Sequence, residues 1–271
     1  MHWADIQFNN ARKFTTRIPA LDLVYTVPKN TIFSWHLAKY GSFEAENTNI
    51  LLDIFGENSG GMYVDVGANF GWYTCLLSKF AGSAGQVFSV EPDSSNLELL
   101  RQNVAQNSLT NVTIFPCAVS KEDGFLQPHK APPTNPGMHS FVAQSHTPER
   151  SGDQRIEMKT LDGLLSQTSG AINLLKMDIE GFEVNALLGA RATLQRCKHL
   201  LIEYSPGFLK AGNQNVGDFF SSILDSGLKI YTPQQGKLLP VEESEISALL
   251  TCGESDYYWQ RDFICSRESI K

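Results

Sequence analysis

The chain contains 271 residues, of which 42% are hydrophobic and 19% are charged, a composition that suits one large α/β domain with a buried core. Its formal net charge is −7 and no cluster of Lys and Arg occurs, which argues against nucleic acid as a partner. No apolar segment follows a basic start and no apolar run approaches bilayer length, so we expect neither a signal peptide nor a membrane span.

Residues 1–60 are predicted to form an N-terminal extension that caps the functional site of a domain at 61–271. Within the extension, a strand is expected at Leu21–Val27, which Pro28 ends, and a helix is expected over about Glu44–Phe55. The helix is indicated by apolar residues that recur on one face: Ile50, Leu51, Ile54 and Phe55.

From Met62 onwards, short apolar runs alternate with amphipathic segments, which predicts alternating strands and helices. The predicted strands are Met62–Val66, Val87–Val90, Val112–Pro116, Ile172–Met177, Leu200–Glu203, Leu228–Tyr231 and Trp259–Cys265. The predicted helices are Trp72–Lys79, Asn96–Asn107, Phe182–Leu188 and Val216–Ser226. Such βαβ units predict an α/β, Rossmann-like fold with a mostly parallel sheet and helices on both faces. The last two strands lack a helix between them, so we expect an antiparallel edge strand. Ligands of such sheets bind in the loops that follow the parallel strands.

An irregular, proline-rich segment interrupts the alternation at about 124–152. It is too long for a simple connection in a compact domain, so we expect a lid-like insertion. His139 within this segment is a candidate base at neutral pH, and a solvated loop histidine is the alternative.

The five cysteines bear on the environment of the protein. Their number is odd, they never form a CxxC pair, and most have apolar neighbours: Cys75, Cys117, Cys197, Cys252 and Cys265. This usage favours buried thiols in a reducing compartment over disulfides or a zinc site. We therefore expect a cytoplasmic protein.

The segment VDVGANFGWYT, at Val64–Thr74, has the form of a glycine turn that holds the charged part of a cofactor after the first strand of the domain. A dinucleotide would need a second glycine where Asn69 stands, and Asp65 would face its phosphates. Two like charges about 5 Å apart at an effective dielectric near 20 repel by roughly 3 kcal/mol. The turn therefore disfavours a pyrophosphate, and with it a nicotinamide-dependent oxidoreductase.

The same acid would favour S-adenosylmethionine, because this cofactor carries an ammonium and a sulfonium but no phosphate. Asp65 would attract these charges, while the helix N-terminus takes the carboxylate. The next strand ends in Glu91, where an acid suits two ribose hydroxyls, and the third leads to Cys117, Ala118 and Val119, which could border an adenine ring. The alternative is that both acids only cap turns and helices.

Four blocks of the chain resemble successive signature segments of the FkbM-type family of S-adenosylmethionine-dependent methyltransferases. They are VDVGANFGWYT, VFSVEPDSSNLELLRQNVAQN, LLKMDIEGFEVNALLGA and LLIEY, and the resemblance extends over about 43–204. It implies the class I methyltransferase fold, with a seven-stranded sheet and one antiparallel strand. It also implies S-adenosylmethionine as cofactor and, usually, O-methylation of a hydroxyl on a secondary metabolite or sugar. Taking pattern and resemblance together, we expect these cofactor-binding residues: Asp65, Gly67, Asn69, Gly71, Glu91, Pro92, Ala118 and Asp178.

A hydroxyl acceptor needs a group that takes its proton, and the candidate catalytic residues are Asp178, Glu180 and His139. Asp178 ends the fourth strand, and neighbouring strands lie about 4.8 Å apart, so Glu203 at the end of the fifth could lie within its reach. Close carboxylates either keep a proton with a raised pKa or share a divalent cation, and here we expect no metal. The alternative for Glu180 is charge pairing with a helix N-terminus alone.

These features together predict an O-methyltransferase whose partner is a small hydroxylated molecule, and a homodimer is compatible with the sequence. An amine acceptor is the first alternative, although the Asn/Asp-Pro-Pro-Tyr motif of many amino methyltransferases is absent after Asp178. An oxidoreductase and a non-catalytic cofactor-binding protein are further alternatives. His36 and Tyr40 could close the acceptor pocket, or form an aromatic cluster with Trp35 and Phe43 that packs the extension onto the sheet.

Overall fold

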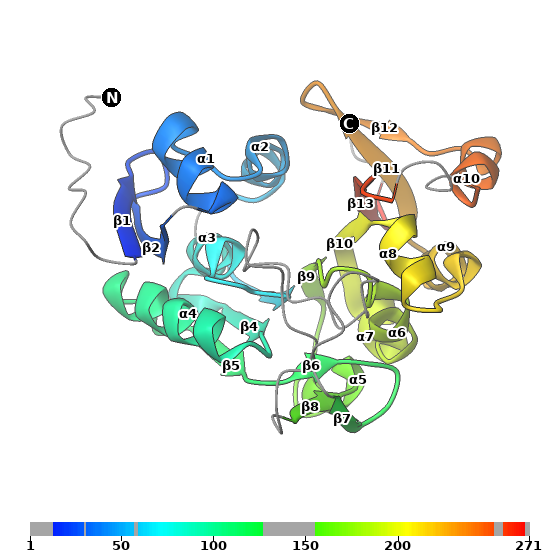
Figure 1. Cartoon of the computed structure of the whole chain (residues 1–271), viewed down its shortest axis with the longest axis horizontal. Helices are drawn as coiled ribbons and strands as arrows, with labels where there is room; N and C mark the ends of the chain where they lie inside the picture. Colours follow the sequence, from blue (N-terminus) through cyan, green and yellow to red (C-terminus); the bar gives the residue numbers. More distant parts are fainter. Residues whose placement is uncertain (1–12, 30, 57–58, 127–154, 252–256, 269–271) are drawn as a thin grey trace.

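The protein is described by a computed structural model that covers residues 13–29, 31–56, 59–126, 155–251 and 257–268 (Figure 1). Its centre is an eight-stranded sheet in the order β12-β11-β13-β10-β9-β3-β4-β5. In that order the strands are Lys237–Pro240, Lys229–Gln234, Arg261–Ser266, Cys197–Tyr204, Ile172–Met177, Met62–Val66, Gln86–Val90 and Val112–Phe115. The five strands from β10 to β5 run parallel, as the alternating pattern of the sequence predicts.

The antiparallel part of the sheet differs from the expectation in two ways. β13 is not an edge strand: it lies between β10 and β11 and runs antiparallel to both. An eighth strand, β12, is added beyond β11 through a tight turn at Gln235 and Gly236. Both turn residues have positive φ, of 54° and 73°, the backbone that a two-residue hairpin favours. The expected seven strands with one antiparallel member are present, and β12 extends them at the edge.

Helices cover both faces of the sheet, as predicted (Figure 1). One face packs against α5 to α10, which are Leu161–Leu164, Glu183–Leu188, Arg191–Arg196, Pro206–Ala211, Val216–Asp225 and Glu243–Leu249. The other face packs against α1 to α4, which are Ile32–Tyr40, Ala45–Ile54, Trp72–Ala81 and Ser94–Gln106, and a short 3-10 turn follows α3 at Gly82–Ala84. Two large apolar clusters result, one on each side of the central strands, and a small third cluster joins Ala68 to Leu97 and Leu100 of α4.

A small second sheet borders the predicted insertion. Its order is β6-β8-β7, with β6 at Ala118–Val119, β8 at Ile156–Lys159 and β7 at Gly124–Leu126. The antiparallel pair of β7 and β8 brings the two ends of the segment at 124–152 together. Apart from β7, the lid-like insertion predicted there lies outside the described residues.

The N-terminal extension shares its core with the domain. It begins with an antiparallel hairpin of β1 (Lys13–Ile18) and β2 (Leu23–Pro28), of which only the second strand was predicted. The helix predicted at about Glu44–Phe55 is α2, and α1 was not predicted as a helix. Buried residues of the extension, among them Tyr25, Leu37 and Leu51, join the same apolar cluster as α3. The extension therefore completes the helical layer on this face rather than forming a separate core.

Amide side chains at the C-terminal end of α4, one in the helix and one directly after it, bind the outer edge of the hairpin. Asn107 accepts from the backbone N–H of Val24 and donates to its carbonyl, both at 2.7 Å. Asn103 does the same for Thr26, at 2.7 and 3.0 Å, and also donates to the carbonyl of Phe70 at 2.7 Å. Because no strand of the described residues pairs with β2 on this side, the two amides satisfy backbone groups of its outer edge.

Two sequence expectations concern the whole chain. The cysteines at 75, 117, 197 and 265 are buried and form no disulfide, as predicted, and Cys252 lies outside the described residues. None of the helices in the described ranges combines the length and the apolar character that crossing a bilayer requires.

Candidate functional site

A row of polar side chains crosses the sheet at the carboxyl ends of its central strands. Asp65 of β3 is in register with Ser89 of β4 and Lys176 of β9. Glu203 of β10 is in register with Asp262 of β13. Residues two positions apart in a strand share a face, so these side chains continue the face that carries Tyr63, Leu174, Leu201 and Ile264. Charged groups thus replace the apolar core where the sheet meets the extension.

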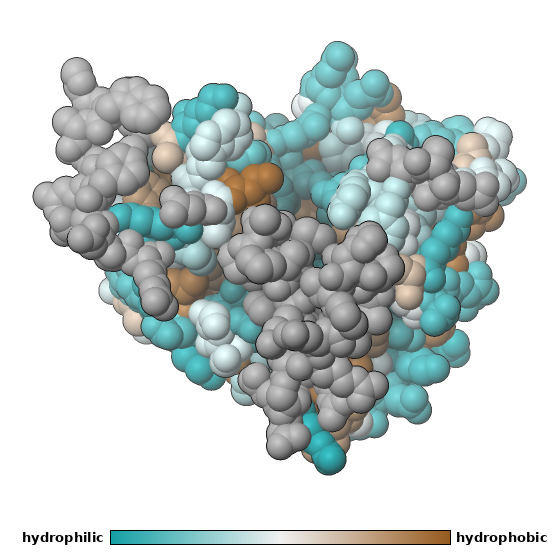
Figure 2. Space-filling model, in the orientation of Figure 1, coloured by the Kyte–Doolittle hydropathy of each residue, from teal (hydrophilic) through white to brown (hydrophobic). Residues whose placement is uncertain are grey.

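A cavity of about 400 Å³ opens beside this row, a volume within the ~300–1,000 Å³ range of small-molecule sites. Its walls come from the loops after β3, β4, β9 and β10, from the extension, and from the segment around Tyr258. The extension contributes Ile32, Phe33 and Phe43, and Figure 2 shows hydrophobic surface where α1 and α2 border the centre of the molecule. The cavity therefore combines an acidic floor with an apolar side.

The glycine turn after β3 is held tightly against two neighbouring strands. The N–H groups of Gly67 and Ala68 both donate to the carbonyl of Val90, each at 3.0 Å. Gly67 has φ +78°, and a Cβ atom there would lie 1.9 Å from the carbonyl oxygen of Asp178. Only glycine fits such a position. Gly71, with φ +93°, precedes the first turn of α3 but does not border the cavity.

Glu91 joins the loops that follow β3 and β4. One carboxylate oxygen accepts from the N–H of Asn69 at 2.7 Å, and the other accepts from the N–H of Asp93 at 2.8 Å. Burial raises the pKa of Glu91 to about 7, although these two donors act in the opposite direction. A carboxylate offers about four acceptor positions, so Glu91 keeps capacity for the hydroxyls of a ligand. Pro92 borders the cavity beside it.

The turn after β9, Asp178–Gly181 (the DIEG turn), places two candidate catalytic residues at the cavity. Glu183 holds the turn, because its carboxylate accepts from the N–H groups of Ile179 and Gly181 at 2.9 and 3.0 Å. Glu180 has φ 54° and Asp178 precedes it, and both side chains are half-buried and line the cavity. A left-handed backbone is uncommon for glutamate and marks a residue that its surroundings constrain. Burial, followed by the Asp178 carboxylate, raises the pKa of Glu180 to about 8.

Asp178 and Glu203 come together as the strand spacing predicts. Carboxylate oxygens of Asp178, Glu183 and Glu203 all lie within 4.8 Å of one another. Burial raises the pKa of Glu203 well above its ordinary value, and Asp178 adds to this effect. The hydroxyl of Ser205 donates to Glu203 at 2.8 Å. The absence of a metal here stays a prediction.

Lys176 supplies positive charge to this acidic group. Its ammonium lies 3.5 Å from Asp178, 3.8 Å from Asp65 and 3.0 Å from the carbonyl oxygen of Gly67. Burial alone would lower the pKa of Lys176, but the carboxylates of Asp178 and Asp65 outweigh it and raise the pKa. The ammonium also lies 5.4 Å from the ring centre of Tyr73.

Asp65 occupies a different place from the one expected of a ligand-binding acid. It is fully buried and does not border the cavity. One carboxylate oxygen accepts from the hydroxyl of Thr74 at 2.6 Å, and the other faces Lys176 and has no hydrogen-bond partner among the described residues. Its effect on a bound molecule therefore passes through Lys176 and the glycine turn, and direct binding by Asp65 stays a prediction.

The remaining predicted residues divide into two groups. Ala118 is buried in β6 and does not border the cavity, and His139 lies outside the described residues. His36 and Tyr40 form an aromatic cluster with Trp35 and Phe43, with ring centres 5.1 to 6.0 Å apart. Of these four, only Phe43 borders the cavity, which favours the packing interpretation over a pocket role.

Five charged residues at the site were not predicted: Glu44, Asp93, Lys176, Glu183 and Asp262. Lys176 has a signal in the sequence, since a lysine inside an apolar strand needs anionic partners. Asp262 and Glu44 come from segments remote in the chain, and their proximity depends on the antiparallel insertion of β13 and on the packing of the extension.

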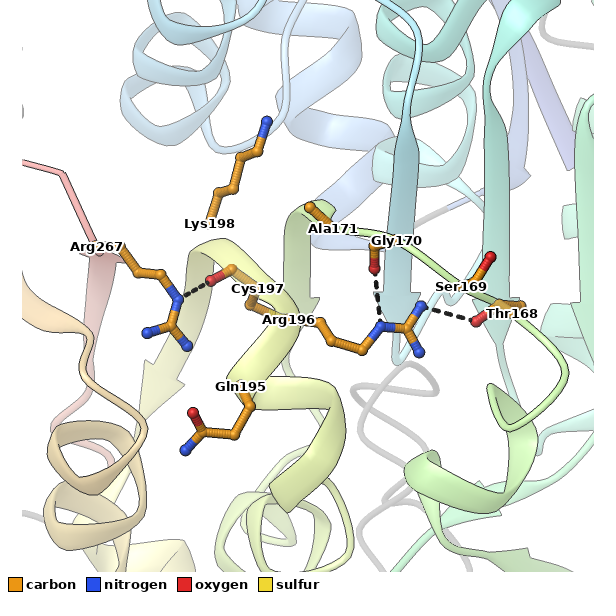
Figure 3. A pocket seen from close by; sticks show the side chains of 9 residues that line it. All are labelled: Thr168, Ser169, Gly170, Ala171, Gln195, Arg196, Cys197, Lys198 and Arg267. Atoms are coloured by element: carbon orange, nitrogen blue, oxygen red, sulfur yellow. Dashed lines mark hydrogen bonds between the residues drawn. The ribbon is translucent and has the colours of Figure 1, made fainter.

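A second, shallow pocket at the opposite ends of β9 and β10 does not resemble a functional site (Figure 3). Arg196 donates to the carbonyl of Gly170 and the hydroxyl of Thr168, and Arg267 donates to the carbonyls of Leu194 and Cys197. Figure 3 shows the Arg267 guanidinium directed at the carbonyl of Cys197 and the Arg196 guanidinium directed at Gly170 and Thr168. Both arginines are thus used to hold the ends of structural elements.

Fold and site together define a class: a Rossmann-like protein with a small-molecule cavity at the carboxyl edge of its parallel strands. The model of the methyltransferase FkbM domain matches residues 65–227, and the chain belongs to this family.

Two curated relatives are methyltransferases by name. Hexuronic acid methyltransferase AglP of Haloferax volcanii is 26% identical over 148 residues, which cover 53% of this chain and 55% of that protein. Methyltransferase 1 of Beauveria bassiana is 26% identical over 143 residues, which cover 46% and 57% respectively. The chain thus spans a little more than half the length of each relative. The crystal structure of methyltransferase FkbM from Methylobacillus flagellatus matches with a TM-score of 0.48 at 19% identity, covering 77% of this chain and 44% of that one. The fold assignment rests on the sheet topology described above.

The residues at the cavity fit S-adenosylmethionine. Gly67 and Asn69 of the glycine turn border the cavity, and Glu91 retains acceptor positions at the end of the second parallel strand. The acidic groups along the floor outnumber the single buried lysine beside them, which suits a ligand with two positive centres. An anionic pyrophosphate would instead meet several carboxylates.

Proposed function

We propose that the chain is an S-adenosylmethionine-dependent O-methyltransferase that acts on a hydroxyl of a small molecule, such as a secondary metabolite or a sugar. The observation that carries the proposal is the position of Glu180. This half-buried carboxylate, with a pKa of about 8, faces the same cavity as the glycine turn. Membership of the methyltransferase FkbM family supports the reaction type.

When bound, the cofactor supplies an electrophilic methyl group, so the protein has to position the acceptor and take up a proton. Gly67, Asn69 and Glu91 would hold the cofactor at one end of the cavity. Glu180 would accept the proton of the acceptor hydroxyl, because a base with a pKa near the working pH combines availability with proton affinity. Asp178 would orient the acceptor while its charge is balanced by Lys176.

The apolar side of the cavity would exclude water from the reacting groups. Phe33 and Phe43 of the extension lie 4.6 Å apart between ring centres, with their planes tilted by 54°, and both border the cavity. A sugar has one apolar face, which aromatic rings recognise. The name of the Haloferax relative, which refers to hexuronic acid, supports a sugar as the acceptor class.

The two alternatives are an N-methyltransferase and a nicotinamide-dependent oxidoreductase. An amine acceptor depends less on a general base than a hydroxyl does. The raised pKa of Glu180 would then have no role in the reaction. A nicotinamide cofactor would place its phosphates at the glycine turn, beside the carboxylate of Asp178, at unfavourable energy.

The proposal is tested in two steps. Calorimetry should detect S-adenosylhomocysteine binding and no NAD binding, and the reverse result would overturn the cofactor assignment. Transfer of a labelled methyl group should then be measured on matched acceptors that differ only in a hydroxyl or an amine at one position. Label in the hydroxyl compounds supports O-methylation, and label confined to the amines overturns it.

A further inference from the structure

Glu44 reaches the cavity from the extension. It immediately precedes α2 with φ 43°, and its side chain is half-buried and borders the cavity. Its carboxylate accepts from the hydroxyl of Tyr73 and from the side-chain amide of Asn47, the latter at 3.5 Å. Like Glu180, it is a glutamate in the left-handed region that faces the site. The fold therefore holds this carboxylate in place at some conformational cost.

No cation of the described ranges forms an ion pair with Glu44. The charged groups that face it are Asp178, Asp262 and Lys176. The Lys176 ammonium is already shared between Asp178, Asp65 and the carbonyl of Gly67, at 3.5, 3.8 and 3.0 Å. Burial, together with the two aspartates, raises the pKa of Glu44 to about 7. A cationic ligand group would relieve this repulsion.

The hydrogen bond from Tyr73 ties Glu44 to the start of α3. Tyr73 is the second residue of that helix, directly after the glycine turn. The amino-acid end of the cofactor is expected at this helix start, because the free N–H groups attract its carboxylate. The ammonium of the same amino acid then needs an anionic partner nearby. Asp65, which the sequence suggests for this role, is fully buried and faces Lys176.

We propose that Glu44 binds the α-ammonium group of the cofactor. This inference rests on the proposed function, since it requires S-adenosylmethionine in the cavity. It gives the extension a direct part in cofactor binding, beyond packing against the sheet. Asn47 and Tyr73 position the carboxylate, and both can do so whether or not a ligand is present.

The test compares two ligands by calorimetry on the whole chain. S-adenosylhomocysteine carries the ammonium, and 5′-methylthioadenosine shares the nucleoside and the sulfur but has no amino-acid head. Glu44→Gln should weaken S-adenosylhomocysteine binding about tenfold or more and leave methylthioadenosine unchanged, because the amide keeps the acceptor for Tyr73 and loses the charge. The control is Glu46→Gln in the same helix, whose exposed side chain accepts from the N–H of Gly236 outside the cavity.

The outcomes separate the two proposals. Equal losses for both ligands, or no loss, would overturn the role of Glu44 and leave the proposed function intact. If the unsubstituted protein binds neither ligand, the proposed function itself fails. A second measurement needs no variant: the unsubstituted protein should bind S-adenosylhomocysteine at least tenfold more tightly than its desamino analogue. Equal binding of these two would also overturn the role of Glu44.

Discussion

Gly67 and Asp178 touch through their backbones: a Cβ atom at position 67 would lie 1.9 Å from the carbonyl oxygen of Asp178. The glycine turn after β3 and the turn Asp178–Gly181 after β9 are therefore packed against each other at the ends of these neighbouring strands. This contact fixes the distance between the group that would hold the cofactor and the groups that would act on the acceptor.

Replacing Gly67 by Ala should separate the two turns and weaken S-adenosylhomocysteine binding at least tenfold. The positive φ adds about 1–2 kcal/mol of backbone strain to the steric clash, so the free energy of unfolding should fall as well. The matched control is Gly236→Ala, which has φ +73° but no atom within 4 Å of the added Cβ. Urea unfolding and calorimetry of both variants measure the difference, and equal losses at the two positions would contradict the steric argument.

Replacing Glu180 by Gln should lower kcat by about 10²–10⁴ if this residue is the base, while S-adenosylhomocysteine binding stays unchanged. Only the deprotonated form can accept a proton. Given the pKa of about 8, kcat/KM should rise from pH 7 to pH 9 and level off above that. The exposed Glu242→Gln is the control. A flat pH profile in the unsubstituted enzyme would assign proton uptake to another group.

The stability of the empty protein should fall as pH rises from about 5 to 8. Burial raises the pKa of Glu91 to about 7, so the folded state holds a proton that the unfolded state releases near its ordinary value of 4.5. A raised carboxyl pKa stabilises the fold below the unfolded value, and this contribution is lost through the folded value. Urea unfolding of Glu91→Gln should show a pH dependence smaller by about 1–3 kcal/mol. An unchanged dependence would contradict the burial of an ionisable group at this position.

Removing metal ions should leave methyl transfer unchanged. The carboxylate oxygens of Glu183 already accept backbone hydrogen bonds, and Lys176 provides positive charge 3.5 Å from Asp178. Activity should be compared after dialysis against a chelator and after addition of Mg²⁺, with the Mg²⁺-bound chelator as control. Loss of activity that Mg²⁺ restores would show instead that the cluster of Asp178, Glu183 and Glu203 holds a cation.

Local patterns in the sequence predict the parallel half of the sheet well. The runs that form β3, β4 and β9 are apolar, of strand length and separated by helices, so their order and direction follow from the chain itself. The antiparallel half depends on contacts between remote segments, so the interior position of β13 has no local signal. In α1, the exposed Trp35 and Tyr40 obscure the helical pattern, because apolar residues there do not all face the core.

Site residues at the ends of strands could be predicted from the sequence. The surroundings of a side chain inside a strand were harder to predict. Asp178 and Glu203 meet because adjacent strands end together. Asp65 lies two residues further back on the same face, in register with Lys176, where it is fully buried and faces the Lys176 ammonium instead of the cavity. This depth depends on the neighbouring strand and on what packs over it, and a motif confined to one loop does not contain that information.

The side chain of Asn103 forms hydrogen bonds both to the backbone of Thr26 in β2 of the extension and to the carbonyl of Phe70 in the glycine turn. Detaching the hairpin would therefore also remove a support of the turn. By thermodynamic linkage, a molecule that stabilises the turn makes detachment of the hairpin more costly by the same free energy. The resistance of the N-terminal hairpin to proteolysis should therefore report whether the cavity is occupied, and this measurement does not require the acceptor to be known.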